Sequence, residues 1–208
     1  MTQDIVDNRF MRSNKGICYL FPIYRYDNGK KMFNINTDLS RELEELYKTT
    51  ISEIDIFYYI YGILHSRIYR TKYSEFLKID FPRIPFVKEY NRFDELSRLG
   101  KELSDLHLMK KQFPPTVKYE ISGSNSVETP KYTDGKLYIN KTQYFGNIPE
   151  SIWNFHIGGY QVLDKWLKSR KKRELSVQEI LHFIQIVEVL KETSRIMDEI
   201  DKIDFLPE

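Results

Sequence analysis

The chain has little cysteine and no long apolar run, and each absence narrows what it can do. Its one cysteine, Cys18, excludes an internal disulfide and any cysteine-based zinc site, which fits a reducing cytoplasm. No stretch approaches the roughly 18 apolar residues of a membrane span, and the first ten residues carry charge where a signal peptide is apolar. We therefore expect a soluble, cytoplasmic protein.

Loops of the common nucleotide-dependent enzymes are also missing. The sequence contains no G-x-G, which a dinucleotide or S-adenosylmethionine loop needs, and no P-loop. Asp134-Gly135-Lys136 is the one D-x-K tripeptide of the kind that metal-dependent nucleases use, but its glycine suits a hairpin turn better. Phe113–Thr116 has the two prolines of an amino-methyltransferase loop with the polar and aromatic positions reversed. We predict no catalytic centre and no cofactor in this chain.

The histidines give no sign of a metal site. No two of the four lie at the four-residue spacing of a helical metal pair. His65 ends an apolar segment, where capping of the last carbonyls of a helix is the favoured role. His107 follows Leu103 by one turn of an amphipathic helix, which favours a hydrogen-bonded core or boundary position over a metal ligand.

Length and composition describe an ordinary globular protein. A chain of 208 residues with 41% hydrophobic and 30% charged residues has room for one sizeable domain or two small lobes. The 15 tyrosines and 13 phenylalanines serve folded cores and binding faces equally well. Because the net charge is only +2, any nucleic-acid surface must come from local clustering of basic residues.

The first of two predicted lobes, residues 1–112, is mainly helical after an N-terminal strand. The strand covers residues 17–26 and a turn follows at Asp27-Asn28-Gly29. Ser52 is expected to cap a buried helix that is apolar nearly all round, and Ser66 to separate it from the next helix. The expected helices are residues 38–48, 56–66, 67–78 and 88–110, with an extended segment at Asp80–Pro85.

The second lobe, residues 113–208, combines a hairpin region at about 116–148 with C-terminal helices. Within residues 131–140, Asp134-Gly135 suits a type I′ turn. Helices are expected at about 161–169 and from a capping box at Ser176–Glu179 to about Asp201. The last helix carries a stripe expected to face a core, made of Val177, Ile180, Leu181, Ile184, Val187 and Leu190. The fold class is α+β, mainly helical with a small antiparallel sheet region.

A basic cluster, residues 165–173, holds six basic residues in nine and no acid. Basic residues beyond Arg170 exceed what a helix end needs, so phosphate contact and an ordinary solvated surface carry equal weight. Gly158-Gly159 just before it allows close approach of backbone to a phosphate, or equally tight packing of a strand-to-helix turn. The candidates for phosphate contact are Lys165, Lys168, Arg170, Lys171 and Arg173.

Two further segments are weaker candidates. Arg67 and Arg70 interleave with Tyr69 and Tyr73, which adds hydroxyl donors to a possible phosphate grip, although a solvated helix face is the default reading. The segment from Ser122 to Gln143 is rich in Ser, Asn and Lys, and such side chains have donors and acceptors for base edges. A polar loop is the plain alternative. The candidates for base contact are Asn125, Lys131 and Gln143.

Blocks of sequence from Gly16 to about Asp201, roughly nine-tenths of the chain, resemble one known family. They are Tyr19–Gly29, Asp55–Ser66, Tyr69-Arg70, Tyr73, Leu77-Lys78, Asp80–Phe86, Gly100–Leu103, Ile139–Phe145, Trp153–Phe155 and Ile157–Arg170. In this order they resemble the C-terminal specificity domain of type ISP restriction–modification enzymes, which are single-polypeptide, ATP-dependent systems.

The resemblance implies a DNA target-recognition module with no catalysis of its own. In that family a nuclease, a helicase-like ATPase and an adenine N6-methyltransferase lie upstream, so S-adenosylmethionine, ATP and Mg²⁺ belong to the parent enzyme. The implied partners are double-stranded DNA and the methyltransferase domain. Because sequence-reading loops differ between members, the divergent stretch Pro114–Gly135 is expected to carry readout. The alternative is a protein–protein docking module that touches no DNA, which salt dependence of binding distinguishes.

Overall fold

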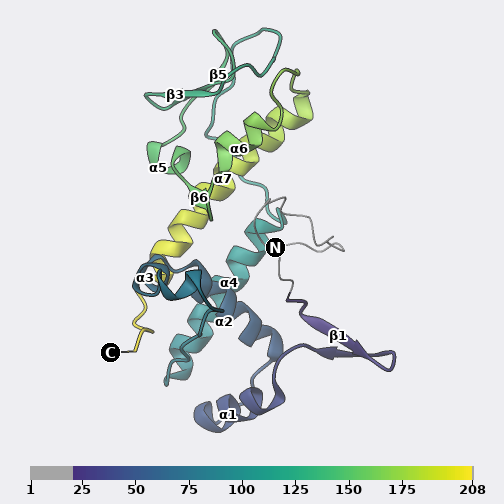
Figure 1. Ribbon diagram of the computed structural model, residues 1–208, viewed down its shortest axis with the longest axis vertical. Coiled ribbons are helices and arrows are strands. Elements are labelled where there is room, and N and C mark those ends of the chain that lie inside the picture. The colour runs from purple at the N-terminus through teal and green to yellow at the C-terminus, as the bar shows by residue number, and fades with distance from the viewer. Residues whose placement is uncertain (1–20, 208) are drawn as a thin grey trace. The chain divides into compact units, whose positions relative to one another are not determined.

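The computed structural model describes residues 21–207, which form two compact units (Figure 1). The first unit contains the chain up to Lys110 together with Arg195–Glu208, and the second contains Lys111–Ser194. The sequence-based division placed residues 195–208 in the second lobe, whereas the structure assigns them to the first unit. Contacts with the first unit agree with this assignment, among them the Ser66 hydroxyl, which donates to Asp201 Oδ1 at 2.6 Å, and Arg92, which donates to Asp204 O at 2.8 Å. No helix within residues 21–207 is long and apolar enough to cross a membrane.

The first unit begins with a hairpin of β1 (Tyr24–Asp27) and β2 (Lys30–Phe33). Its turn residues Asn28 and Gly29 have φ of 46° and 79°, the two positive values that a type I′ turn requires. The predicted strand began at residue 17, and its residues 17–20 lie outside the described part of the chain. Helix α1 (Thr37–Tyr47) follows as predicted.

Two helices, α2 (Glu53–His65) and α4 (Tyr90–His107), form the centre of the first unit. They pack backbone to backbone, since a Cβ at Gly100 would lie 1.9 Å from the Tyr58 carbonyl oxygen. The predicted burial of α2 is confirmed in coarse form, since every one of its residues is buried or half-buried and none is exposed. Only one face is fully buried, because α4 covers one side; that face holds Ile56, Tyr59, Gly62 and Ile63.

The helix that follows α2 is shorter than predicted. Ser66 ends α2 and caps α3 (Arg67–Lys72), and only a 3₁₀ turn at Phe76–Lys78 continues toward Lys78. The chain is then extended, as the two prolines predicted. Tyrosine hydroxyls hold this extended segment, with Tyr59 donating to Pro85 O at 2.7 Å and Tyr69 to Arg83 O at 2.8 Å.

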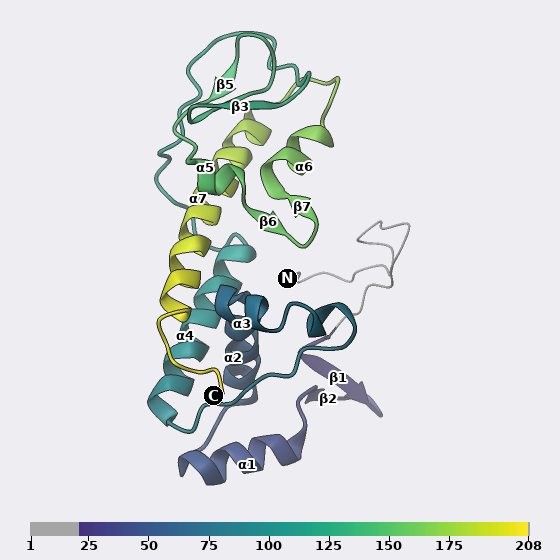
Figure 2. The same ribbon diagram turned by 60° about the vertical axis from the view of Figure 1, so that its left-hand side comes forward.

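The second unit contains a three-stranded antiparallel sheet of β3 (Lys131–Thr133), β4 (Lys136–Tyr138) and β5 (Tyr144–Phe145). The predicted hairpin is confirmed, with Asp134 and Gly135 at φ of 48° and 76°. Figures 1 and 2 show this sheet at one end of the unit. The sheet is followed by α5 (Glu150–Trp153), β6 (His156–Ile157), β7 (Tyr160–Gln161) and α6 (Val162–Lys168).

Helix α7 (Val177–Ile200) supplies much of the second unit's core. Its capping box is confirmed, because Glu179 N donates to Ser176 Oγ and Ser176 N donates to Glu179 Oε2. The predicted stripe is only partly buried. Val177 and Leu181 are 64% and 59% exposed, because these two residues, one turn apart, share a face that nothing else in the unit covers. Ile180, Ile184, Val187 and Leu190 are buried as predicted. The α+β fold class is confirmed.

Candidate nucleic-acid interface

Gln143 lies at the centre of a buried polar network in the second unit. Its side chain is 1% exposed. Its Oε1 accepts from Asn125 N at 2.9 Å and from Asn140 Nδ2 at 2.9 Å. Its Nε2 donates to Tyr119 Oη at 3.2 Å, Ile121 O at 3.0 Å and Asn125 Oδ1 at 2.8 Å. Every donor and acceptor of the amide is therefore engaged, and the expectation that Gln143 contacts a base is not supported by this arrangement.

Asn125 belongs to the same network and has a structural role as well. It adopts a left-handed conformation with φ of 56°, which asparagine tolerates better than most residues. Its Oδ1 also accepts from Tyr119 Oη at 2.9 Å. Gly123 beside it has no room for a side chain, since an added Cβ would lie 2.6 Å from Gln143 Oε1. Two of the three predicted base-contacting residues thus face the interior of the loop and set its shape.

Lys131 is the third, and it differs from the two amides. It begins β3 and is exposed, and its side chain forms no ion pair with any residue that the structure describes. The backbone of Lys131 is held in a regular strand, and its side chain lies in solvent. Of the three predicted base-contacting residues, it is the one placed to reach a ligand.

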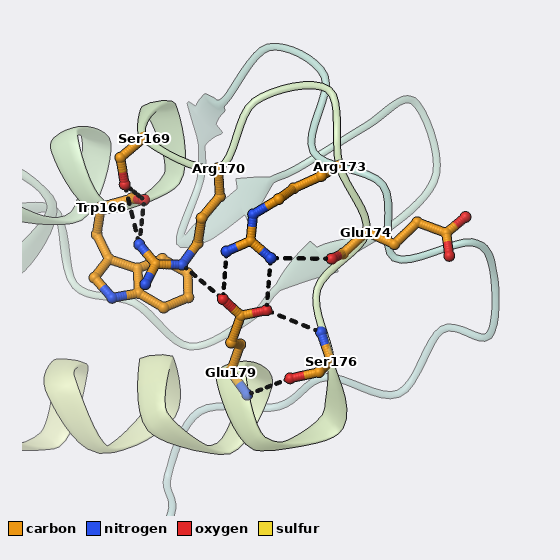
Figure 3. A network of polar contacts seen from close by, with 7 residues as sticks. All are labelled: Trp166, Ser169, Arg170, Arg173, Glu174, Ser176 and Glu179. Atoms are coloured by element: carbon orange, nitrogen blue, oxygen red, sulfur yellow. Dashed lines mark hydrogen bonds and ion pairs between the residues drawn. The ribbon is translucent and has the colours of Figure 1, made fainter.

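The basic cluster is divided in the same way, and Figure 3 shows the contacts of its two arginines. Glu179 accepts from Arg170 Nε at 3.0 Å, from Arg173 Nη1 at 3.0 Å and from Arg173 Nη2 at 2.5 Å. The Arg170 guanidinium also lies 3.6 Å from the centre of the Trp166 ring. Hydrogen bonds from Arg173 and from Ser176 N lower the pKa of Glu179 to about 2. Arg170 and Arg173 therefore fasten the 170–176 loop to the start of α7.

The lysines of the cluster have weaker contacts or none. Lys168 Nζ lies 2.7 Å from Asp164 Oδ2 one turn earlier, and Lys165 Nζ lies 4.9 Å from the Tyr160 ring centre. Lys171 and Lys172 are exposed, and neither side chain pairs with a carboxylate within residues 21–207. These two lysines leave their charge available to an anion.

Backbone hydrogen bonds join the basic cluster to the polar loop. Val127 N donates to Arg173 O at 2.9 Å, and Lys172 N donates to Val127 O at 2.8 Å. Leu175 N donates to Asn125 O at 2.9 Å. Residues about 45 positions apart in the sequence therefore form one continuous surface, which sequence reasoning had treated as two separate candidates.

The remaining candidates are less favourable. Arg67 forms an ion pair with Asp198 in the first unit, while Arg70 is exposed on α3. Of the two expected hydroxyl donors, Tyr69 is buried and donates to Arg83 O, so it is not available, while Tyr73 is half-buried. Gly158-Gly159 forms the turn of the β6–β7 hairpin with no atom within 4 Å of an added Cβ, so the alternative of tight packing was wrong.

His65 and His107 take the hydrogen-bonded positions that the sequence favours. His65 Nδ1 lies 2.8 Å from Tyr61 O at the end of α2, and His107 Nδ1 lies 2.6 Å from Tyr61 Oη. Burial and the neighbouring His65 lower the pKa of His107 to about 4. Within residues 21–207 no group of three or more metal-ligating side chains lies close enough to hold an ion.

Known proteins of similar sequence and structure point to one family. The family model of the Type ISP C-terminal specificity domain matches residues 1–199. No curated protein sequence matches significantly.

Three solved structures share the fold. The DrdV–DNA complex has a TM-score of 0.73 and 26% identity over 86% of this chain and 21% of that one. The ATP-dependent Type ISP restriction–modification enzyme LlaBIII bound to DNA has a TM-score of 0.67 and 24% identity over 88% and 13%. A nuclease-deletion mutant of the Type ISP enzyme LlaGI with a DNA substrate mimic has a TM-score of 0.62 and 26% identity over 90% and 15%.

The chain thus spans about a fifth or less of the length of each protein it matches in structure. The family match, by contrast, covers nearly all of this chain. The chain belongs to the Type ISP C-terminal specificity domain family.

Proposed function

We propose that this chain is the sequence-reading module of a longer restriction–modification enzyme and that it binds double-stranded DNA directly. One observation carries the proposal: the loop that bears Lys171 and Lys172 is hydrogen-bonded along its backbone to residues 125–127 of the polar loop. Unpaired lysines suit contact with phosphate, and a neighbouring polar surface suits contact with base edges. The solved structures of similar fold, described as DNA-bound enzymes, support the same partner.

In this proposal the basic residues have different roles. Lys171 and Lys172 bind the phosphate backbone, assisted by Lys165 and Lys168, which are exposed and also contact Tyr160 and Asp164. Arg173 adds charge while it holds the loop, since its side chain is half-exposed. Arg170 acts through the loop's shape. Arg67 and Arg70 remain weaker candidates for backbone contact. Lys131 contacts bases, while Asn125 and Gln143 fix the conformation of the loop beside it.

The catalytic functions belong elsewhere in the parent protein under this proposal. An adenine N6-methyltransferase, a nuclease and an ATPase would precede this module, and S-adenosylmethionine, ATP and Mg²⁺ would bind there. The present chain has no G-x-G, P-loop or E-x-K motif for those reactions. We expect the 208-residue chain to show no methylation, cleavage or ATP hydrolysis.

A selection experiment tests the proposal. The 208-residue chain is titrated with a pool of randomised duplexes, bound sequences are read out, and the affinity for the selected duplex is measured at several salt concentrations. A selected sequence should emerge, and the logarithm of the association constant should fall linearly with the logarithm of the salt concentration. Binding that shows neither sequence preference nor salt dependence would contradict the proposal.

One observation favours docking to protein as a second function. Val177 and Leu181 present an exposed apolar face on α7. Such a face is suited to contact with another part of a larger enzyme. This docking is compatible with DNA binding by the second unit's loops, and it predicts that Leu181→Ser improves the solubility of the isolated chain without changing its affinity for DNA.

A further inference from the structure

The three-stranded sheet of the second unit has one face in the core and one in solvent. Strand pairing places Tyr132 opposite Leu137, and Leu137 opposite Phe145. Leu137 and Phe145 are fully buried, and Tyr132 stacks on Trp153 with ring centres 5.5 Å apart. Because side chains alternate along a strand, the intervening residues lie on the opposite face.

That opposite face carries two lysines and two tyrosines. Lys131 is paired with Tyr138, and Tyr138 with Tyr144, while Thr133 is paired with Lys136. Lys131, Thr133 and Lys136 are exposed and both tyrosines are half-buried. The rings of Tyr138 and Tyr144 lie 5.1 Å apart. We call these five residues the solvent face of the sheet.

We propose that this solvent face enters the major groove of double-stranded DNA, where Lys131 and Lys136 read guanine. The inference rests on the proposed function and adds the groove, the element and the base to it.

The dimensions of the hairpin fit the groove. The major groove is about 12 Å wide and admits a two-stranded β-ribbon. Lys136 is opposite Thr133, which is two residues from Lys131, so the lysines are offset by about 6.6 Å along the ribbon. This offset is close to two base-pair steps of about 3.4 Å each. The two lysines can therefore meet bases about two steps apart in the same groove.

The chemistry of the face suits guanine. In the major groove guanine presents two acceptors, O6 and N7, and a lysine ammonium has donors only. None of the five positions of the solvent face holds a carboxylate, whereas two acids, Glu120 and Asp134, line the hollow beside Lys136. Adenine and cytosine present an amino donor that an ammonium cannot accept. Adenine keeps one acceptor, N7, and thymine one, O4, whereas guanine presents two side by side, so lysines here favour guanine.

Neighbouring groups leave the Lys136 side chain both oriented and accessible. Its Nζ lies 4.9 Å from the centre of the Tyr144 ring. A hollow of about 200 Å³ opens beside it, lined by Lys136 and Tyr144 and also by the acids Glu120 and Asp134. The ring limits the directions that the lysine samples, and the hollow leaves space for a base edge or bridging water.

Base analogues in the selected duplex test this assignment with the 208-residue chain. Replacing a contacted guanine by 7-deazaguanine, which lacks N7, should weaken binding several-fold. Inosine keeps O6 and N7 and lacks only the minor-groove amino group, so it should bind like guanine. Replacing the whole G·C pair by A·T should cost roughly 5- to 150-fold at each of two positions.

Variants assign each position to one lysine. Lys131→Ala should abolish the preference at one guanine and Lys136→Ala at the other, with unchanged melting temperatures because both side chains are exposed. Lys141→Ala is the matched control: it removes an exposed lysine between β4 and β5 and should keep both preferences.

Several outcomes would overturn the inference. A selected site without guanine, or equal sensitivity to inosine and 7-deazaguanine, would exclude major-groove reading by these lysines. Sequence preference that survives both substitutions would place readout on another element and leave the proposed function intact. Absence of any DNA binding by the unmodified chain would overturn the proposed function and this inference together.

Discussion

Two sets of polar residues in the second unit differ in what they contact. The inward set, centred on Gln143 and Glu179, makes hydrogen bonds to the protein's own backbone and side chains. The outward set, Lys131, Lys171 and Lys172, is exposed and forms no ion pair within the described residues. The inward set fixes the shape of the surface, and the outward set leaves charge available to a ligand.

This difference affects how a loop rich in hydrogen-bond donors is interpreted from its sequence. Amide side chains look suited to base edges, but a buried amide with all its groups paired cannot exchange its partners without leaving buried groups unsatisfied. An exposed lysine gives up only contacts with water. Substitutions in the inward set should therefore alter stability first and DNA binding second, with the reverse order in the outward set.

The largest effect on stability is expected from Gln143→Ala. The change removes five side-chain hydrogen bonds and leaves the buried partners of the amide unsatisfied. We expect the free energy of unfolding to fall by about 3 kcal/mol, at the upper end of ordinary substitutions. Chemical denaturation of the 208-residue chain measures it.

Thr142→Ala is the control for this change. Thr142 is exposed next to Gln143 and should cost well under half as much. Hydrogen exchange adds a local readout, since the Asn125 amide donates to Gln143 and should lose protection only in the Gln143 variant. A stable Gln143→Ala protein with altered base preference would place Gln143 in the outward set after all.

The sequence predicts the position of a polar residue only where near neighbours in the chain determine the local backbone geometry. Asp134-Gly135 gave a turn and Ser176 with Glu179 gave a capping box, because both depend on neighbours within four residues. Asn140 was a missed local signal: its Oδ1 accepts from Gln143 N at 2.8 Å, which marks a turn that directs Gln143 inward.

Other features could not be predicted in this way. The burial of Gln143 depends on Tyr119 and Asn125, about 20 residues away, and the pairing of Arg170 depends on where α7 begins. Leu181 is exposed because no other element of the second unit covers its face of α7, and the spacing of apolar residues along a helix cannot show this. Pattern identified the elements and the general region of the interface, whereas tertiary contacts decided which of its side chains face a ligand.

A smaller and pH-dependent effect is expected at Glu179. Its folded pKa is lowered to about 2 from an ordinary 4.5, so the stability it contributes is present above pH 4.5 and is lost as the pH falls toward 2. Glu179→Gln keeps a capping side chain but removes the charge that binds Arg170 and Arg173.

Melting temperatures across pH measure this contribution. The variant should melt below the unmodified chain at pH 6, and the difference should shrink between pH 4.5 and 2. Glu174→Gln, a change of an exposed neighbouring carboxylate directed away from Glu179 in Figure 3, should show no such convergence. A gap that stays constant down to pH 2 would mean that the charge of Glu179 does not hold the loop.

The smallest effect on stability, and a definite effect on binding, is expected from Lys171→Ala. Lys171 is exposed and unpaired with any carboxylate of the described residues, so the free energy of unfolding should change by less than about 0.5 kcal/mol. If it contacts a phosphate, its loss weakens binding to preferred and scrambled duplexes alike, because phosphates are the same at every step. The slope of log affinity against log salt should become shallower by about 0.9.

Lys88→Ala removes an equal charge from an exposed position of the first unit and should leave the slope within about 0.3 of its original value. An identical slope change in both variants would show that net charge acts on DNA binding and that Lys171 makes no contact of its own.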